Sequence, residues 1–337
     1  GVSVLLTASA STLFEFVVLR FVAGVGAGAM LACQATLAAE YSPDKYKALS
    51  VAIVTSGYPA GAMLTSVAAG YIMPDYGWTG MFWFGGIITL TMAVIALLLL
   101  PESLKYLFER RPAGALARAN RILARLGKPA IDALPDVVAR DADRRRNMFG
   151  NVKLLLSGEH WKATLTLWAT FFMCFGTLYF LMSWIPRLME HSGFSAEAGR
   201  QAFFLFNLSA IIGVFVLGFL ATRWKLSTLV ASFLLLSAVS MVAFAAAPRN
   251  LELLLAITFA IGFLQQGGFM GLYAVAAKLY PTRIRSTGIG WAIGLGRFGA
   301  VVGPALAGYL IAAGLDMSMN YYLFAVPMAI GGLLAWR

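Results

Sequence analysis

The chain has 337 residues, of which 60% are hydrophobic and 12% are charged, and its mean hydropathy is +0.78. A soluble domain of this length cannot bury so much apolar surface in one core, so a soluble globular protein is excluded. The net charge of +11 would fit a nucleic-acid-binding protein, but the charges lie in the gaps between apolar segments, and nucleic acid is not an expected partner.

Long apolar segments recur along the chain, and each of nine has roughly the 20 residues that are needed to cross about 30 Å of hydrocarbon. Backbone groups in lipid must hydrogen-bond within their own segment, so these segments are expected to be helices. Their hydrophobicity is continuous rather than alternating, which argues against a β-barrel. The expected spans are 13–35, 48–73, 80–100, 162–186, 203–221, 227–247, 251–277, 287–313 and 321–336.

The first apolar run, 1–10, is too short to cross a bilayer. It begins with Gly and has no basic leader, so it is not expected to be a signal peptide. We expect it to be the end of a helix whose beginning is absent from the chain.

One large hydrophilic segment, 101–161, separates three spans from the last six. Its sequence ALARANRILARLG has apolar residues at helical spacing with arginines between them, which predicts surface helices. The run Arg144-Arg145-Arg146 is interpreted as a solvated or lipid-facing cluster. The expected domains are an incomplete N-terminal half over 1–100, a basic linker over 101–161 and a C-terminal half over 162–337.

Basic residues are distributed unequally between alternate gaps. One set holds Lys45, Lys47, the 101–161 segment, Arg223, Lys225, Lys278, Arg283 and Arg285. The other set holds only Arg187, Arg200 and Arg249, which are offset by Glu190, Glu197 and Glu252. By the positive-inside rule the first set faces the cytoplasm, which predicts a multi-pass inner-membrane protein with a cytoplasmic C-terminus. The bilayer, with its anionic headgroups, is a sufficient partner for these charges.

The chain contains an internal repeat. AAEYSPDKYKA at Ala38–Ala48 is echoed by AAKLYPTRIRS at Ala276–Ser286, with an offset of 238 residues. The same offset carries Gly24 onto Gly262 and Gly61 onto Gly299. Repeats of this kind, with a site at their interface, are typical of transporters. Since six spans follow the linker, we expect a six-plus-six architecture that lacks its first two helices and part of the third.

Several motifs resemble those of the major facilitator superfamily: RFVAGVGAGA at Arg20–Ala29, PESLKYL at Pro101–Leu107 and GFLATRW at Gly218–Trp224, which has Thr222 where an acid is usual. Within that superfamily, YPTRIRSTGIGWAIGLGRFGAVVGPALAGYL at Tyr280–Leu310 resembles the aromatic acid/H⁺ symporters, which include transporters of 4-hydroxybenzoate and protocatechuate. The resemblance implies an all-α integral membrane fold of two pseudo-symmetric six-helix halves, and proton-coupled uptake of an aromatic carboxylate by alternating access.

Arg297 is the strongest candidate for a substrate-binding residue. A charge at its depth in a span costs several kcal/mol unless it faces a cavity or a partner, and no acid lies within one helical turn. A guanidinium binds a carboxylate in bidentate geometry, which suits an organic anion. The alternative is a structural arginine that caps carbonyls or pairs with another helix.

Other polar and aromatic residues inside the spans are further candidates for the substrate site, although aromatic residues in membrane helices commonly face lipid or the bundle core, and Trp184 also suits the membrane interface. These candidates are Gln265, Gln266, Tyr273, Asn207, Tyr179 and Trp184.

Four charged residues are candidates for coupling or gating. Arg20 belongs either to a proton-coupling network or to a structural pair, and Glu40 suits a gate salt bridge better than a substrate contact. Arg283 and Arg285 lie in the matching loop of the second half and are potential gate partners.

The sequence shows no nucleophile–base pair, metal-ligand spacing or phosphate-binding loop, so we expect neither an enzyme nor a cofactor. The predicted ligands are an aromatic carboxylate and protons, handled by a monomer. The alternatives are transport of another organic acid or a sugar, or a truncated membrane protein that does not transport.

Overall fold

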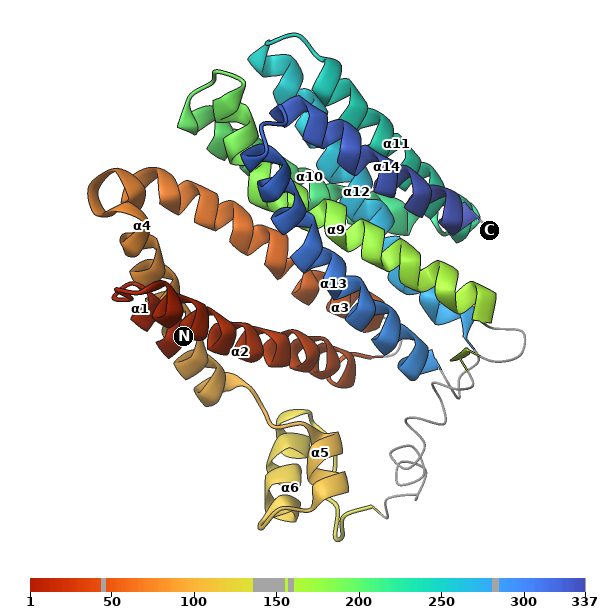
Figure 1. Cartoon of the computed structure of the whole chain (residues 1–337). Coiled ribbons are helices and arrows are strands. Elements are labelled where there is room, and N and C mark those ends of the chain that lie inside the picture. The colour runs from red at the N-terminus through yellow and green to blue at the C-terminus, as the bar shows by residue number, and fades with distance from the viewer. Residues whose placement is uncertain (44–46, 136–154, 157–160, 281–284, 337) are drawn as a thin grey trace. The chain divides into compact units, whose positions relative to one another are not determined.

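The computed structural model describes residues 1–43, 47–135, 155–156, 161–280 and 285–336 (Figure 1). Eight helical segments in these ranges are long and apolar enough to cross a membrane. The chain divides into two compact units, one containing Gly1–Gly57 and Ala68–Asp143 and the other Tyr58–Val67 and Arg144–Arg337. The expectation of an all-helical membrane protein is therefore confirmed.

The first unit begins with the short helix α1 (Val2–Thr7), followed by α2 (Leu13–Glu40), α3 (Lys47–Thr55) and most of α4 (Gly57–Leu99). Thr12 and Glu15 form a capping box that begins α2. Glu15 also accepts hydrogen bonds from Ser11 and so satisfies donors at the helix start.

The sequence predicts separate spans over 48–73 and 80–100, whereas the structure has one apolar helical segment, Ile53–Leu99, of 47 residues. At 1.5 Å per residue this segment would extend about 70 Å, more than twice the hydrocarbon thickness. Gly77, with φ 60° and ψ −162°, breaks the helical geometry inside α4. Glycine adopts this conformation at little cost, so Gly77 separates two spans and accounts for the difference between nine expected spans and eight helical segments.

The expected surface helices of the linker are α5 (Leu104–Arg110) and α6 (Ala115–Arg125). They enclose a small core of Leu107, Ala115, Ala119 and Ile122. The arginines of α6 lie outside this core, as its amphipathic sequence predicts. Arg144-Arg145-Arg146 lies outside the described residues.

The second unit contains the six helices expected after the linker, and their bounds are α9 (Trp161–His191), α10 (Ala196–Leu220), α11 (Leu226–Ala246), α12 (Leu251–Leu279), α13 (Arg285–Ala312) and α14 (Met317–Trp336). They pack mainly as the pairs α9 with α13, α10 with α12, and α11 with α14 (Figure 1). Aromatic and aliphatic side chains from these helices form one continuous core.

The pairs approach closely where glycines face main-chain atoms of the partner helix. A Cβ at Gly299 would overlap the carbonyl oxygen of Phe172, and one at Gly303 would overlap that of Gly176. Gly213 and Gly262 have the same role between α10 and α12. Small residues let membrane helices pack backbone to backbone, and the α9–α13 crossing places the middle of α13 beside the aromatic residues of α9.

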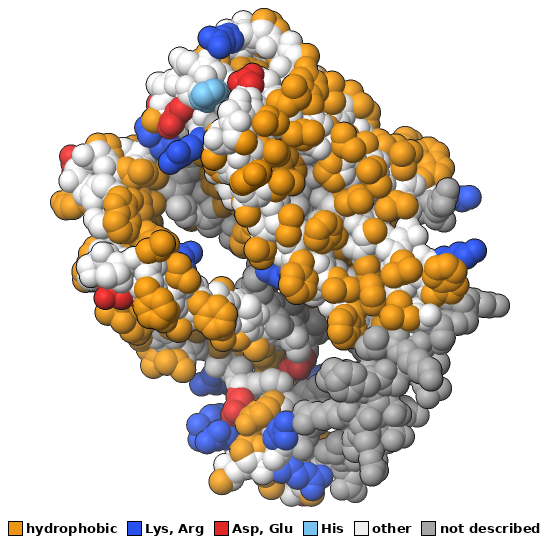
Figure 2. All heavy atoms as spheres, viewed as in Figure 1, with side chains coloured by type: hydrophobic (Ala, Val, Ile, Leu, Met, Phe, Trp, Pro, Cys, Tyr) orange, Lys and Arg blue, Asp and Glu red, His pale blue; other side chains and the backbone are white. Residues whose placement is uncertain are grey.

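Figure 2 shows apolar side chains covering most of the face of the second unit that is in view, with charged side chains mainly towards its edges. Large exposed side chains include Val239, Val301 and Leu333. An apolar belt of this extent would be unfavourable in water and is the surface that a helical bundle presents to lipid.

Candidate functional site

Arg297 lies in the apolar stretch Thr287–Ala312 of α13. Its guanidinium carbon stands over the ring of Phe175 on α9, 5.7 Å from the ring centroid. The arginine is held there because the Gly299 and Gly303 crossing brings the two helices together. No carboxylate lies within ion-pair distance of Arg297 among the residues that the structure describes. Its positive charge is therefore available to an anion.

Phenols from three helices lie in the neighbourhood of this charge. The Arg297 guanidinium lies within electrostatic range of Tyr58 on α4 and Tyr273 on α12, and both of these phenols interact with Tyr179 on α9. The Tyr58 hydroxyl also lies 4.0 Å from the sulfur of Met182. We call Arg297, Tyr58, Tyr179, Tyr273 and Phe175 the Arg297 cluster. It provides one fixed cation and three hydroxyl groups that both donate and accept hydrogen bonds.

An aromatic wall continues behind the cluster. Phe175 packs edge-on against Phe269 with ring centroids 4.7 Å apart, and Phe269 packs against Tyr273 at 5.6 Å. Phe171 lies 5.2 Å from Tyr273, also edge-on. These T-shaped contacts form an apolar, aromatic environment beside the Arg297 guanidinium, which stands over the Phe175 ring. Such a combination suits a small ligand that has a ring at one end and a negative charge at the other.

Gln265, Gln266 and Asn207 are buried, at 0%, 4% and 0% exposure. Both amide atoms of Gln265 and the side-chain oxygens of Gln266 and Asn207 have no hydrogen-bond partner among the described residues. An unpaired buried amide costs about 1–3 kcal/mol, so these groups are positioned for a partner such as water or a polar ligand. Gln265 and Gln266 lie four and three residues before Phe269 on α12, so both amides are about one helical turn from the aromatic wall.

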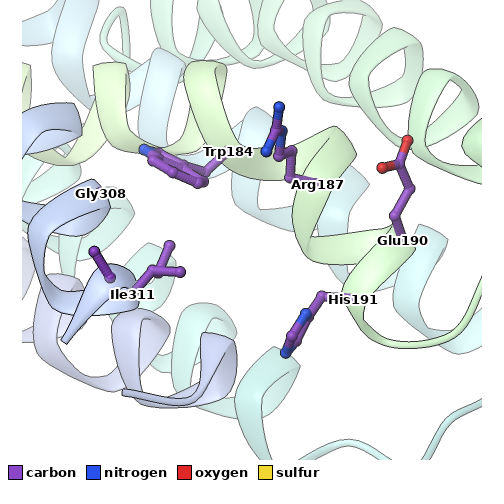
Figure 3. Close-up of a pocket in the computed structure, with 7 residues that line it drawn as sticks. Trp184, Arg187, Glu190, His191, Gly308 and Ile311 are labelled. Carbon is purple, nitrogen blue, oxygen red and sulfur yellow. The ribbon is translucent and has the colours of Figure 1, made fainter. Parts of the chain in front are cut away.

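Trp184 lies apart from the Arg297 cluster. Its indole Nε1 donates to the carbonyl oxygen of Pro304, 3.2 Å away, and its ring lines a different pocket near the end of α9 (Figure 3). Tyr179 and Tyr273 thus interact with each other, with Arg297 in electrostatic range of Tyr273, whereas Trp184 lies elsewhere, and a substrate role for these residues stays a prediction.

Two of the candidate coupling and gating residues, Arg20 and Glu40, lie in the first unit. Arg20 stands 5.3 Å from the ring centroid of Phe82, and no carboxylate in the described part of the chain lies within ion-pair distance of it. Glu40 accepts a hydrogen bond of 2.6 Å from the hydroxyl of Ser103 in the PES motif. Arg283 falls outside the described residues, and Arg285 begins α13.

Further contacts join the end of α2 to the linker helices. The Tyr41 hydroxyl donates to the main-chain oxygen of Glu102, and Arg118 of α6 pairs with the Glu102 carboxylate at 3.2 Å. Burial, together with the nearby charges of Glu40 and Glu102, raises the pKa of Tyr41. The phenol therefore remains protonated and keeps its donor.

Sequence reasoning missed Tyr58 because a lone tyrosine at the start of a span carries no energetic signal. The 238-residue repeat offset does place Pro59, its neighbour, opposite Arg297. Phe175 and Phe269 were also missed, since aromatic residues in membrane helices are common and only their packing distinguishes these two.

The chain matches the family model of the Major Facilitator Superfamily over residues 1–230 and 167–337. The chain is 30% identical over 321 residues to the benzoate transport protein of Acinetobacter baylyi, covering 95% of this chain and 68% of that protein. It is also 30% identical over 333 residues to the 4-hydroxybenzoate transporter PcaK of Pseudomonas aeruginosa, covering 98% and 73%.

Among solved structures, the fold is similar to that of the proton:xylose symporter XylE, with a TM-score of 0.66 and 17% identity over 96% of this chain and 70% of that chain. At this level of identity the likeness concerns the fold alone. The family match agrees with the helical membrane architecture and confirms a transporter rather than an enzyme. The chain belongs to the Major Facilitator Superfamily.

Proposed function

We propose that this protein takes up an aromatic carboxylate together with protons by alternating access. The observation that carries the proposal is the Arg297 cluster, a guanidinium inside a membrane span that is surrounded by phenols and backed by aromatic rings. The similarity to transporters named for benzoate, gallate and 4-hydroxybenzoate supports the same substrate class.

In this proposal the substrate carboxylate pairs with Arg297 in bidentate geometry. Hydroxyl groups of Tyr58, Tyr179 and Tyr273 donate to the carboxylate oxygens and hold its plane, while the substrate ring packs against Phe175. The buried amides of Gln265, Gln266 and Asn207 meet polar substituents or water at the far end.

Tyr58 is expected to contribute to affinity through its hydroxyl. Tyr58→Phe removes one hydrogen bond to a charged group, worth about 1.5–3 kcal/mol, so the apparent KM should rise roughly 10-fold or more with the protein normally folded. The exposed tyrosine Tyr71 on the same helix provides the control Tyr71→Phe. Initial uptake rates over a range of substrate concentrations measure the effect, and an unchanged KM in Tyr58→Phe would exclude the hydroxyl from the site.

The charge asymmetry supports placing the basic gaps and the C-terminus in the cytoplasm of a bacterium, with the protein in its inner membrane. In this orientation α5 and α6 form a cytoplasmic linker between the N-terminal half, 1–100, and the C-terminal half, 162–337. One Arg297 cluster per chain is consistent with a monomer as the working unit.

Gating is assigned to charged residues near the cytoplasmic ends of the helices, and coupling to an arginine inside α2. Glu40, hydrogen-bonded to Ser103, and the basic residues Arg283 and Arg285 of the matching loop are the proposed gate. Arg20, whose guanidinium faces Phe82, is the proposed member of the proton-coupling network. Each transport cycle would then protonate and deprotonate a titratable group that interacts electrostatically with these charged residues.

A substrate panel tests the proposal. Proteoliposomes containing the protein should accumulate labelled 4-hydroxybenzoate or benzoate when the outside is acidic, and a protonophore should abolish accumulation. Unlabelled benzoate should compete, whereas benzamide, which keeps the ring but lacks the charge, should not, because Arg297 requires an anion. Competition by xylose or by aliphatic acids alone would favour the alternative substrates, and the absence of any transport would favour a non-transporting protein.

A further inference from the structure

A pocket of about 490 Å³ lies between the ends of α9 and α13 (Figure 3). This volume is within the range of about 300–1,000 Å³ that is typical of small-molecule sites. The pocket belongs entirely to the second unit, and its lining residues are Trp184, Arg187, Glu190, His191, Gly308, Ile311 and Ala312.

One wall of the pocket is aromatic and held in a defined position. The Trp184 indole is fixed by its hydrogen bond to Pro304, and the absence of a side chain at Gly308 leaves room for the ring. A Cβ at Gly308 would lie 3.3 Å from the indole, so a larger residue would press on the ring. Ile311 adds an apolar surface beside it (Figure 3). A flat aromatic ligand could pack on this wall without displacing protein atoms.

The cation available in the pocket is Arg187. Its side chain is exposed, and no carboxylate lies within ion-pair distance of it among the described residues. His191 is engaged differently, because its Nε2 lies 3.9 Å from the carboxylate of Asp316. Glu190, also exposed, adds a negative charge at the rim. The pocket thus pairs one guanidinium with one indole, and its acidic rim disfavours ligands with several negative charges.

The pocket is separate from the Arg297 cluster but is built on the same two helices. Arg187 follows Tyr179 by eight residues on α9, about 12 Å along the helix, and Gly308 follows Arg297 by eleven residues on α13, about 16 Å. Moving outward along the α9–α13 pair, a ligand would therefore meet a second guanidinium and a second aromatic wall.

We propose that this pocket is an outer binding site, at which the aromatic carboxylate docks on Trp184 and Arg187 before it reaches Arg297. The inference rests on the proposed function and on the orientation that puts the sparsely charged loops outside the cytoplasm. The site raises the local substrate concentration at the entrance, and it should have lower affinity than the Arg297 cluster because it offers one guanidinium and one indole but no phenol.

Two measurements on the detergent-purified protein and on proteoliposomes test the outer site. In equilibrium dialysis with labelled 4-hydroxybenzoate, the wild type should bind two equivalents with different affinities. Arg297→Gln should retain only the weak equivalent, and Arg187→Gln only the tight one. In uptake assays Arg187→Gln should raise the apparent KM about three- to fivefold with an unchanged maximal rate, as expected for loss of an exposed ionic contact.

Arg249→Gln is the matched control, because Arg249 is also exposed, lies in another loop of the same sparsely charged set and does not line the pocket. This variant should bind and transport as the wild type does. If the wild type transports 4-hydroxybenzoate but binds one equivalent, and Arg187→Gln keeps the wild-type KM, the outer site is wrong and the proposed function stands. If the wild type neither binds nor transports an aromatic carboxylate, both proposals fail.

Discussion

Arg297→Gln is expected to reduce uptake of aromatic carboxylates to the background of protein-free liposomes at micromolar substrate. The guanidinium is the cation of its cluster, and no carboxylate among the described residues neutralises it. Arg297 is exposed in this structure, so the ion pair is desolvated only once the bound substrate covers it, and removing one member of such a pair costs about 2–5 kcal/mol. That cost corresponds to a loss of affinity of about 30-fold or more.

The size of the effect should depend on the shape of the cation as well as on its charge. Arg297→Lys keeps the positive charge but replaces a planar fork with a single ammonium, so it should retain part of the uptake at a raised KM. Arg249→Gln removes an exposed arginine outside the spans and should leave uptake unchanged. Initial rates of labelled 4-hydroxybenzoate uptake, normalised to the amount of protein in the liposomes, distinguish these variants.

A purely structural role for Arg297 predicts a different result. If the guanidinium only caps carbonyls or pairs with another helix, Arg297→Gln should lower the thermal stability and the yield, and the surviving protein should keep its KM. Normal stability together with a wild-type KM in Arg297→Gln would falsify the carboxylate role.

Gly299→Val is expected to prevent assembly of the second unit or to lower its melting temperature severely. Even a Cβ at this position would overlap the Phe172 carbonyl oxygen, so the valine can be accommodated only if α9 and α13 separate. Overpacking by flexible side chains costs about 1–3 kcal/mol, and a clash with backbone relaxes less readily than one with a side chain. Separation would also move Arg297 away from Phe175 and weaken substrate binding.

Gly294→Val provides the matched control, because it lies on the same helix and a Cβ there meets nothing within 4 Å. The two variants add the same side chain and carry the same helix-propensity penalty, so a difference in their stability reports the close approach of α9 and α13 at Gly299. Size-exclusion profiles and thermal unfolding in detergent measure that stability. Equal melting temperatures for the two variants would contradict the close approach at Gly299.

Much of the architecture could be predicted from the sequence because the signals for it are local. Hydrophobic length identifies spans such as α10 and α11, and the amphipathic pattern of Ala115–Arg125 predicts a surface helix. The division of Ile53–Leu99 was also predicted, since the turn at Gly77 falls between the two expected spans. Motifs in Arg20–Ala29 and Tyr280–Leu310 indicated the superfamily that the family match confirms.

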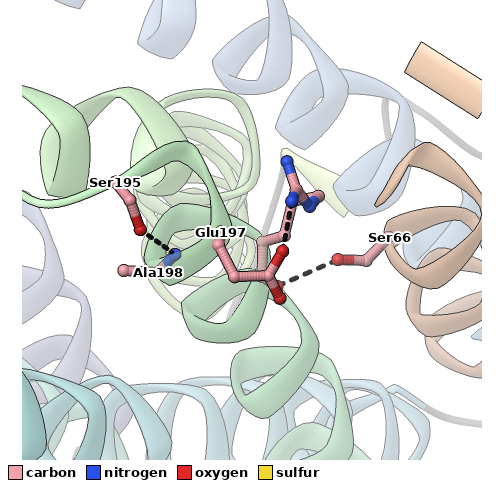
Figure 4. Close-up of polar contacts among 5 residues, drawn as sticks. Ser66, Ser195, Glu197 and Ala198 are labelled. Carbon is pink, nitrogen blue, oxygen red and sulfur yellow. Dashed lines mark hydrogen bonds and ion pairs between the residues drawn. The ribbon is translucent and has the colours of Figure 1, made fainter. Parts of the chain in front are cut away.

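The candidate site was predicted less completely, for reasons visible in particular residues. Arg297 stood out because a charge in hydrocarbon is costly wherever it occurs. Tyr58 carries no such cost and is 239 positions away in the chain, so only the packing of α4 residues 58–67 with the second unit brings it to Arg297. Ser66 reinforces this packing by donating to the carbonyl oxygen of Arg200, next to the Arg200–Glu197 ion pair (Figure 4).

By itself, the sequence determined that this protein spans the membrane many times, which gaps carry its basic residues and which intramembrane arginines need an explanation. These features depend on the residue types in each segment and on how deep a residue lies in its span, and both can be read from the sequence. Only the tertiary structure decided that Tyr179 joins Arg297 while Trp184, five residues further on, lines a different pocket. Which side chains share a site depends on the rotation and crossing of α9 against α13, and glycine contacts between the two backbones set that geometry.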